Sequence, residues 1–152
     1  MPESLTTCLY RLLFNIYPAY RGTGAWVTYI ASDWREIRVC LPLSWRTRNI
    51  VGVIFGGIIY AAVDPFYMIM LMKNLGPEYT VWDKAATVRF KKPGVSSLYA
   101  SFRLEQAELQ TIRSGLQAES RLDRGYAIDL VDSAGTVCAQ VEKTIYIARK
   151  GA

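Results

Sequence analysis

The stretch that decides the fold is NIVGVIFGGIIYAAVDPFYMIMLMKNLG, from Asn49 to Gly76. Between Ile50 and Met72 it contains 23 residues, of which only Asp64 is charged. A run of this length can cross a bilayer, but it can also form an all-apolar helix that is buried inside a protein. The segments around the run indicate which of the two is expected.

Apolar and polar residues alternate on both sides of this run, as they do in half-buried strands. Two strands are expected before it, in AWVTYIA and REIRVCLP, and two after it, in KAATVRFKKPG and LYASFRL. A short amphipathic helix follows between Glu105 and Ser120, and then two strands, GYAIDLV and VCAQVEKTIYIAR, joined by a DSAG turn. Closely spaced strands favour an antiparallel sheet, whose apolar face needs a core element. We therefore expect a buried helix wrapped by a curved sheet, with no stable membrane insertion.

The beginning of the chain predicts one more helix, within residues 1–17. Its apolar residues recur at spacings of four, three and four, which puts them on one helical face: Leu5, Leu9, Leu12 and Ile16. Pro18 ends this helix, and we expect its apolar face to pack on the domain. The length of 152 residues favours one domain, 1–152.

The composition excludes several chemistries and partners. The sequence contains no histidine, which removes Ser-His-Asp and Cys-His mechanisms and the histidine-bearing metal motifs. Cys8, Cys40 and Cys138 form no CxxC pair, and the start of the chain lacks signal-peptide features. We therefore expect reduced thiols in a cytoplasmic protein without a metal or another cofactor. The net charge of +5 fits a solvated positive surface or a site for a phosphorylated small ligand, whereas no pattern typical of nucleic-acid binding is present.

Asp64 and Pro65 interrupt the apolar run and allow two interpretations. Proline in a helix interior removes a backbone hydrogen bond, so the helix should kink or restart there. In the structural interpretation, Asp64 is the N-cap of a second helical segment from Pro65 to Leu75.

In the functional interpretation, Gly56 and Gly57 expose backbone N–H groups where a helix begins. Such groups suit an oxyanion or a polarised carbonyl. Asp64 is close to two turns further along, on nearly the same face as Gly57, where its carboxylate could activate water or attack directly.

The spacing N-x-x-G-x-x-F-G-G-x6-D is formed by Asn49, Gly52, Phe55, Gly56, Gly57 and Asp64. This string resembles the hotdog-fold acyl-CoA thioesterases of the phenylacetate-pathway type. The wider string, with DPFYMIMLMKNLG followed by VWDKAATVRFKKPG, is similar to a poorly characterised bacterial branch of that superfamily, described as a thioesterase-like domain of unknown function.

The resemblance implies an α+β hotdog fold, in which a five- or six-stranded antiparallel sheet wraps around the long central helix. It also implies a homo-oligomer, either a dimer formed through edge strands or a tetramer, with active sites at the dimer interface. The implied reaction is the hydrolysis of an acyl-CoA thioester to the free acid and coenzyme A.

The resemblance also implies roles for individual residues. Gly56 would offer its backbone N–H to the thioester carbonyl, Asn49 would orient the site or the leaving group, and Asp64 would be base or nucleophile toward the neighbouring subunit's substrate. Asp83 falls near a position where relatives place Ser or Thr to hold the water. That alignment is loose by one residue, so Trp82 or Lys84 could take this place.

Further residues are expected to bind the substrate. The phosphates of coenzyme A need surface cations, and the acyl chain needs an apolar wall beside Gly57. The candidates are Arg46, Arg48, Arg89, Lys91 and Lys92 for the phosphates, and Ile54, Ile58, Tyr60, Phe66 and Met70 for the chain. The other interpretation of these residues is a solvated surface and a simple core.

Phe55 departs from the family pattern, because many relatives have histidine at this position. Phenylalanine cannot donate a hydrogen bond to the sulfur leaving group, so catalysis could be slow or need another residue, such as Asp83 or Lys84. The alternative function is therefore a hotdog protein that binds an acyl chain or acyl-CoA without turnover.

Overall fold

The computed structural model describes residues 1–151. Its strands form one antiparallel sheet in the order β1-β2-β4-β5-β6-β3. The strands are β1 (Trp26–Ile30), β2 (Glu36–Leu41), β3 (Tyr79–Phe90), β4 (Leu98–Arg103), β5 (Arg121–Val131) and β6 (Val137–Arg149). The helices are α1 (Leu5–Ile16), α2 (Pro18–Gly22), α3 (Gly56–Val63), α4 (Phe66–Leu75) and α5 (Gln106–Ala118).

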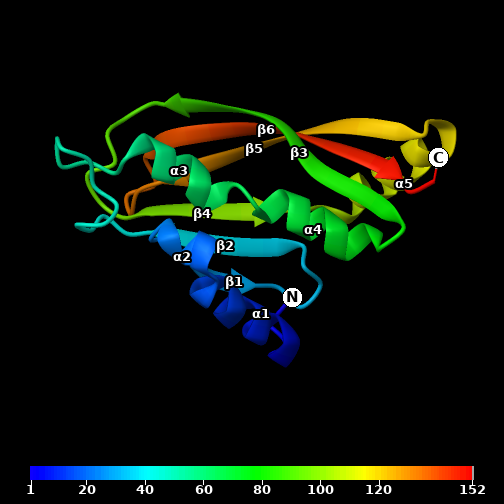
Figure 1. Ribbon diagram of the computed structural model, residues 1–152, viewed down its shortest axis with the longest axis horizontal. Coiled ribbons are helices and arrows are strands. Elements are labelled where there is room, and N and C mark those ends of the chain that lie inside the picture. Colours follow the sequence, from blue (N-terminus) through cyan, green and yellow to red (C-terminus); the bar gives the residue numbers. More distant parts are fainter. Residues whose placement is uncertain (152) are drawn as a thin grey trace.

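The curved sheet wraps around α3 and α4, which lie end to end along one of its faces (Figure 1). α1 and α2 lie beside β1 and β2, and α5 lies at the opposite end of the molecule from α3. A six-stranded antiparallel sheet around a long central helix is the hotdog fold, which confirms the predicted fold class.

The alternating segments form strands as predicted, and their apolar faces point to the central helix. In β2 and β4 every second residue is buried, as the alternation requires: Ile37, Val39 and Leu41 in β2, and Leu98, Ala100 and Phe102 in β4. Leu104, just after β4, continues this face and is also buried. The predicted helix between Glu105 and Ser120 is α5, and the DSAG turn joins β5 to β6. Alternation thus located both the elements and their inner faces.

The apolar run forms the core helix. By length and composition, Gly56–Leu75 is also a candidate membrane span, although 44% of an 18-residue stretch of it is buried inside the protein. The core helix of a folded domain can have the same length and composition. Here Phe66, Met70 and Leu71 are fully buried in the hydrophobic core that the sheet encloses. Packing against the strands therefore accounts for the apolar character of this run.

The helix is interrupted at Pro65, as predicted, but the prediction that Asp64 is an N-cap is wrong. Asp64 is the C-cap residue of α3, and Pro65 takes the N-cap position of α4 without a side-chain hydrogen bond. The backbone of Asp64 is helical (φ −51°, ψ −53°), whereas an N-cap residue needs an extended backbone to turn its side chain onto the next N–H groups. The Asp64 carboxylate is therefore not used in capping.

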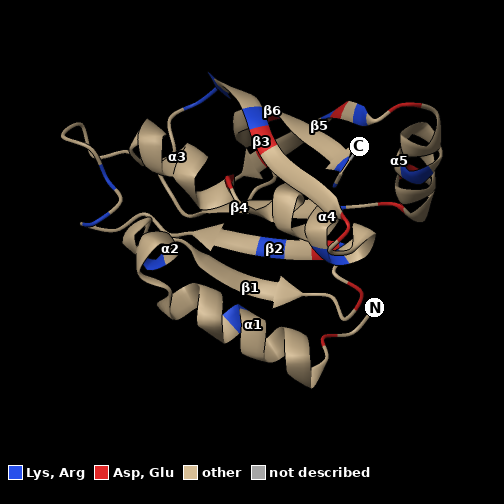
Figure 2. Ribbon diagram, turned by 45° about the vertical axis from the view of Figure 1, so that its right-hand side comes forward, with Lys and Arg blue, Asp and Glu red and all other residues tan. Residues whose placement is uncertain are grey.

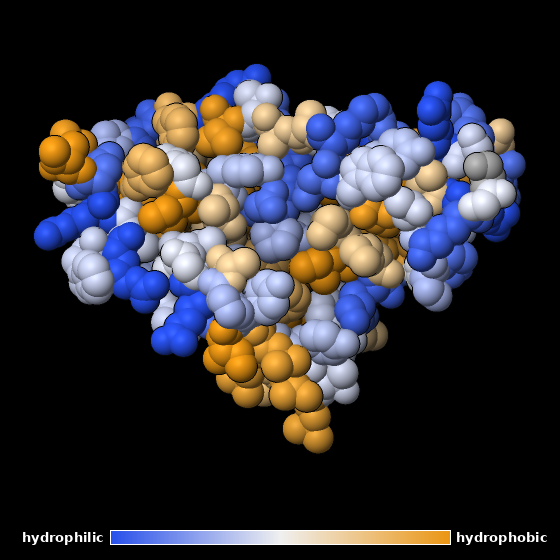
Figure 3. All heavy atoms as spheres, in the orientation of Figure 1, coloured by the Kyte–Doolittle hydropathy of each residue, from blue (hydrophilic) through white to orange (hydrophobic). Residues whose placement is uncertain are grey.

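The prediction for the apolar face of α1 is also wrong, because that face points to solvent. Its four side chains are all exposed: Leu5 (94%), Leu9 (57%), Leu12 (51%) and Ile16 (63%). Figure 3 shows the resulting apolar surface over α1, at the bottom of the view.

A second face of α1 packs on the protein instead. Thr7 is buried, Tyr10 meets the ring of Trp34 edge-on at 5.0 Å, and Phe14 meets that of Phe66 at 6.1 Å. Positions 7, 10 and 14 also follow helical spacing, so the sequence contains two possible stripes. The aromatic stripe faces the core because large rings remove more apolar area from water.

Candidate active site

The first helical residues of α3 present backbone donors. Phe55 is the N-cap residue and offers no side-chain cap, while the N–H groups of Ile58 and Ile59 both donate to its carbonyl (3.0 and 3.2 Å). Among the described residues, the N–H groups of Gly56 and Gly57 have no backbone acceptor. A helix start of this kind suits an oxygen that carries negative charge.

A cavity of about 460 Å³ lies at this helix start. The structure brings six predicted site residues to its wall: Asn49, Ile54, Phe55, Gly56, Lys91 and Lys92. Asn49 Oδ1 accepts the N–H groups of Val51 (3.1 Å) and Val53 (3.2 Å), so part of this side chain shapes its own loop. The amide nitrogen of Asn49 is the group left to meet a ligand.

The cationic residues predicted for phosphate binding do not form one cluster. Lys91 and Lys92 line the cavity at the start of α3, whereas Arg46 and Arg48 are exposed on the preceding loop. Figure 2 shows blue segments on these two loops at the α3 end of the molecule. Arg89 instead pairs with Glu142 at 2.5 Å across β3 and β6.

A second group of polar residues surrounds Asp64, and its centre is Lys143 on β6. The Lys143 side chain is fully buried, and its ammonium donates to the backbone carbonyl of Asp64. The ammonium Nζ lies 3.3 Å from Asp64 Oδ1 and 2.9 Å from Asp83 Oδ1. It also lies 5.8 Å from the ring centre of Tyr60. We call these four residues the Lys143 cluster.

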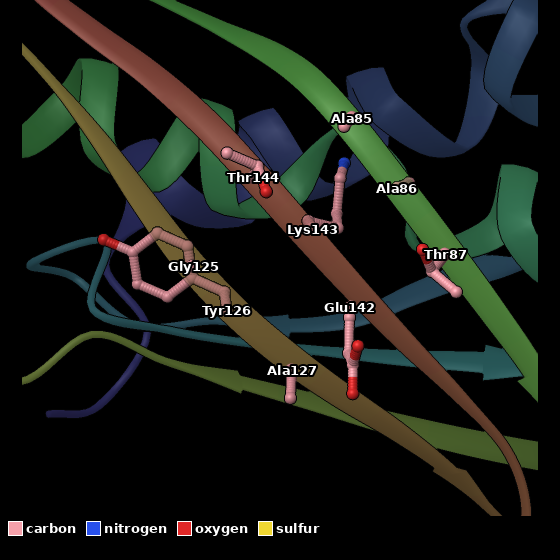
Figure 4. Close-up of a pocket in the computed structure, with 9 residues that line it drawn as sticks. All are labelled: Ala85, Ala86, Thr87, Gly125, Tyr126, Ala127, Glu142, Lys143 and Thr144. Atoms are coloured by element: carbon pink, nitrogen blue, oxygen red, sulfur yellow. The ribbon is translucent and has the colours of Figure 1, made fainter.

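Strand geometry explains why a lysine lies in the core. Val141, Ile145 and Ile147 share the inner face of β6 with Lys143, and all three are fully buried. The strand neighbours of Lys143 are Tyr126 on β5 and Ala86 on β3. Figure 4 shows the lysine extending from β6 toward β3, beside a shallow hollow of about 400 Å³ in the sheet.

A β-bulge in β3 brings Asp83 to this lysine. Asp83 pairs with Ile145 and Ala85 pairs with Thr144, so Lys84 is the extra residue. Asp83 turns inward, whereas Lys84 pairs with Asp123 at 2.5 Å on the exposed side. Both residues lie within β3, which begins at Tyr79.

Trp82 lies outside the Lys143 cluster. It is half exposed, and its ring stacks on that of Tyr146 at 4.7 Å. Of the three neighbouring candidates Trp82, Asp83 and Lys84, only Asp83 contacts the cluster.

Burial raises the pKa of Asp83, and the nearby Asp64 carboxylate adds to this, while Lys143 opposes it. Asp83 Oδ1 is buried, and although Lys143 is at ion-pair distance the two groups do not have hydrogen-bond alignment. Burial and the Asp64 carboxylate raise the pKa of Tyr60 above its usual range. The Tyr60 phenol therefore stays protonated near neutral pH and can donate a hydrogen bond.

Asp64 is the accessible member of the two carboxylates. Its side chain is 42% exposed, against 19% for Asp83. It lines a third cavity, between the N-terminal helices and the central helix, which Gly56 does not reach. Within one chain, Asp64 and the Gly56 N–H therefore face different cavities.

The predicted acyl wall is only partly exposed to a ligand. Phe66 and Met70 are fully buried and line none of the cavities described above. Tyr60 lines the cavity at Asp64, and Ile54 lines the one at Gly56. Gly57 is exposed beside the ring of Phe55.

Lys143 is the functional candidate that the sequence analysis missed. The signal was present, because Lys143 occupies an inward position in the alternating pattern of VCAQVEKTIYIAR. A charged residue on the apolar face of a strand is rarely buried without a partner, so it points to a partner within the core.

Comparisons with known proteins agree with this architecture. The structure is similar to that of a protein of unknown function from Pseudomonas aeruginosa, described as a probable thioesterase, with 17% identity, 98% coverage of both chains and a TM-score of 0.82. It is also similar to a thioesterase from Haemophilus influenzae, with 16% identity, coverage of 99% of this chain and 95% of that one, and a TM-score of 0.70. None of the curated proteins matches the chain in sequence. A family model described as a domain of unknown function, DUF4442, matches residues 6–147, and the chain therefore belongs to this family.

Proposed function

We propose that this protein hydrolyses an acyl-CoA thioester to a free acid and coenzyme A. The observation that carries the proposal is the Asp64 carboxylate, which is accessible at the break of the central helix and held by the buried Lys143. The structural similarity to thioesterases supports the reaction class. The reduced cysteines and the coenzyme A substrate fit a cytoplasmic enzyme.

Asp64 acts as the base in the simplest mechanism. Its carboxylate takes a proton from water while the water oxygen bonds to the thioester carbonyl carbon. The carbon–sulfur bond then breaks, and the sulfur leaves as the thiol of coenzyme A after taking the proton that Asp64 had removed from water. Direct attack by the carboxylate, followed by hydrolysis of an anhydride, uses the same residue.

Gly56 stabilises the charge that develops on the carbonyl oxygen. Its N–H group has no acceptor in the described chain and points from a helix start, where the dipole favours negative charge. Loss of one such donor typically lowers kcat by about 100- to 1000-fold. Asn49 and Lys91 at the same cavity are positioned to meet the leaving group and the phosphates of coenzyme A.

The complete site needs two chains. Gly56 and Asp64 face different cavities of one chain, so the carbonyl held at Gly56 of one protomer would be attacked with the help of Asp64 of another. β3 is a free edge of the sheet, and its second half is exposed on both faces. An exposed edge of this length favours pairing with a second copy, in a homodimer or a tetramer.

The test is a thiol-release assay with acyl-CoAs from acetyl to palmitoyl and with phenylacetyl-CoA. We expect turnover by the wild type and its loss in Asp64→Ala, while Asp129→Ala, on the exposed face of β5, keeps full activity. Circular dichroism checks that both variants are folded. Equal turnover in Asp64→Ala would contradict the role of Asp64.

Phe55 at the start of α3 supports the second candidate, an acyl-CoA-binding protein without turnover. Its ring lines the cavity at Gly56 and cannot donate a hydrogen bond to sulfur. Saturable binding of acyl-CoA without thiol release, at every chain length, would select this function.

A further inference from the structure

The cavity at Asp64 has a wall that the catalytic roles above do not use. It encloses about 410 Å³ between α1, α2 and the central helix. Its lining combines aromatic and aliphatic side chains from both sides, including Phe14, Tyr17, Ala19, Pro65 and Ile69. A cavity of this size lies in the lower part of the usual range for small-molecule sites, roughly 300–1,000 Å³.

Two of the five polar side chains in this wall already have backbone hydrogen-bond partners within the protein. The hydroxyl of Tyr20 donates to the carbonyl of Ala62 at 3.0 Å, and that of Thr23 donates to the carbonyl of Tyr20 at 2.7 Å. Thr23 also accepts the N–H of Ala25 at 3.1 Å. The carboxylate of Asp64 and the hydroxyls of Tyr17 and Tyr60 are therefore the groups left to meet a ligand.

The charge of the cavity restricts its ligand. The described lining residues include Asp64 but no lysine or arginine, and Lys143 contacts Asp64 from the sheet side. An anionic group would be placed beside a carboxylate without a cation of its own, which is unfavourable. A neutral apolar group can occupy the cavity without this repulsion.

We propose that this cavity binds the acyl chain of the substrate and places its thioester carbon at Asp64. This inference rests on the proposed function and gives it a substrate class: thioesters with a medium-length aliphatic or a single-ring aromatic acyl group. Ala19 at the exposed mouth and Ile69 along the wall determine chain length. The same charge favours product release, because hydrolysis creates a carboxylate beside Asp64.

The experiment narrows the cavity at its mouth, where added volume does not disturb the core. Ala19→Trp fills the entrance, and the matched control Ala107→Trp adds the same side chain at an exposed position of α5. Hydrolysis is measured with acetyl-, octanoyl-, dodecanoyl- and phenylacetyl-CoA. Binding is measured separately by calorimetry with S-octyl-CoA, a thioether that cannot be hydrolysed.

We expect Ala19→Trp to lower kcat/KM for octanoyl- and dodecanoyl-CoA by at least about tenfold, to leave acetyl-CoA within about twofold, and to weaken S-octyl-CoA binding. Ala107→Trp should match the wild type. An unchanged chain-length profile in an active Ala19→Trp variant would overturn the acyl site and leave the proposed function intact. If the wild type hydrolyses none of these substrates, the proposed function fails, and S-octyl-CoA binding alone tests the acyl site. Weaker binding to Ala19→Trp than to the wild type would support the acyl site. Equal binding to the two proteins, or no binding to the wild type, would overturn it.

Discussion

At the residue scale, the Lys143 cluster places two carboxylates around one buried ammonium. A buried lysine is costly unless it is paired, and here both carboxylates and a backbone carbonyl surround it. The cluster joins the break of the central helix to β3 and β6. It therefore fixes the position of the Asp64 carboxylate as well as stabilising the core.

Lys143→Met should destabilise the fold, because it leaves the Asp83 carboxylate buried without a counter-charge. We expect a loss of about 2 kcal/mol in the free energy of unfolding, below the usual range for a buried pair since Asp64 is partly exposed. Adding Asp83→Asn should restore part of this loss. Urea unfolding of the single and double variants measures both, and a single variant as stable as the wild type would refute the pairing.

Asp83 makes stability depend on pH in a direction opposite to that of most carboxylates. Its folded pKa is raised above the unfolded value of 3.8, so its stabilising contribution is present below that value and is lost as pH rises through the folded pKa. Relative to wild type, the stability of Asp83→Asn should therefore increase as the pH is raised from about 4 toward neutral. Urea unfolding of both proteins at several pH values in this range provides the test. If the stability of Asp83→Asn relative to the wild type fell as the pH rises, the raised pKa of Asp83 would be contradicted.

The backbone N–H of Gly56 can be removed by a single substitution that preserves the local backbone. Gly56→Pro deletes the N–H at the first helical position, where proline is favoured, and the extended backbone of Phe55 (φ −66°, ψ 128°) is compatible with it. Gly56→Ala is the control, since both variants place a Cβ 2.8 Å from the tip of the exposed Phe90 ring, which can move. We expect about 100-fold lower kcat in the proline variant than in the alanine variant; equal kcat values would exclude the donor role.

At the element scale, the strands and the core helix could be predicted because burial on one face leaves a regular pattern. The orientation of α1 could not, because Leu5 and Leu9 follow helical spacing as well as Tyr10 and Phe14 do. Only the tertiary partners Trp34 and Phe66 decide between the two faces. The candidate site was likewise only partly predictable: the motif indicated Asp64 and Gly56, but spacing alone does not reveal that the distant Lys143 contacts Asp64.

The packing face of α1 can be tested by truncating one residue on each side. Phe14→Ala removes a half-buried ring and should cost about 2 kcal/mol, less than for a fully buried phenylalanine. Leu9→Ala removes an exposed side chain and should change stability by less than about 0.5 kcal/mol. Thermal or urea unfolding compares the two, and a larger loss in Leu9→Ala would reverse the assigned orientation.

At the scale of the whole molecule, the proposed function divides the active site into two half-sites on each chain. The start of α3 has the donors and the lysines, and the break before α4 has the carboxylate and the apolar cavity. Pairing along the free edge of β3 would let each half-site complete that of a second copy. A change that separates the two copies should therefore also abolish the activity.

The most direct measurement is the thioesterase activity of a hybrid that combines two inactive chains. Asp64→Asn and Gly56→Pro chains are co-expressed with different affinity tags, and assemblies that carry both tags are purified. In a dimer with shared sites, one of the two sites combines the intact Gly56 of one chain with the intact Asp64 of the other, so about half of the wild-type activity should return. Activity no higher than that of either variant alone would show that each site lies within a single chain and would contradict the account.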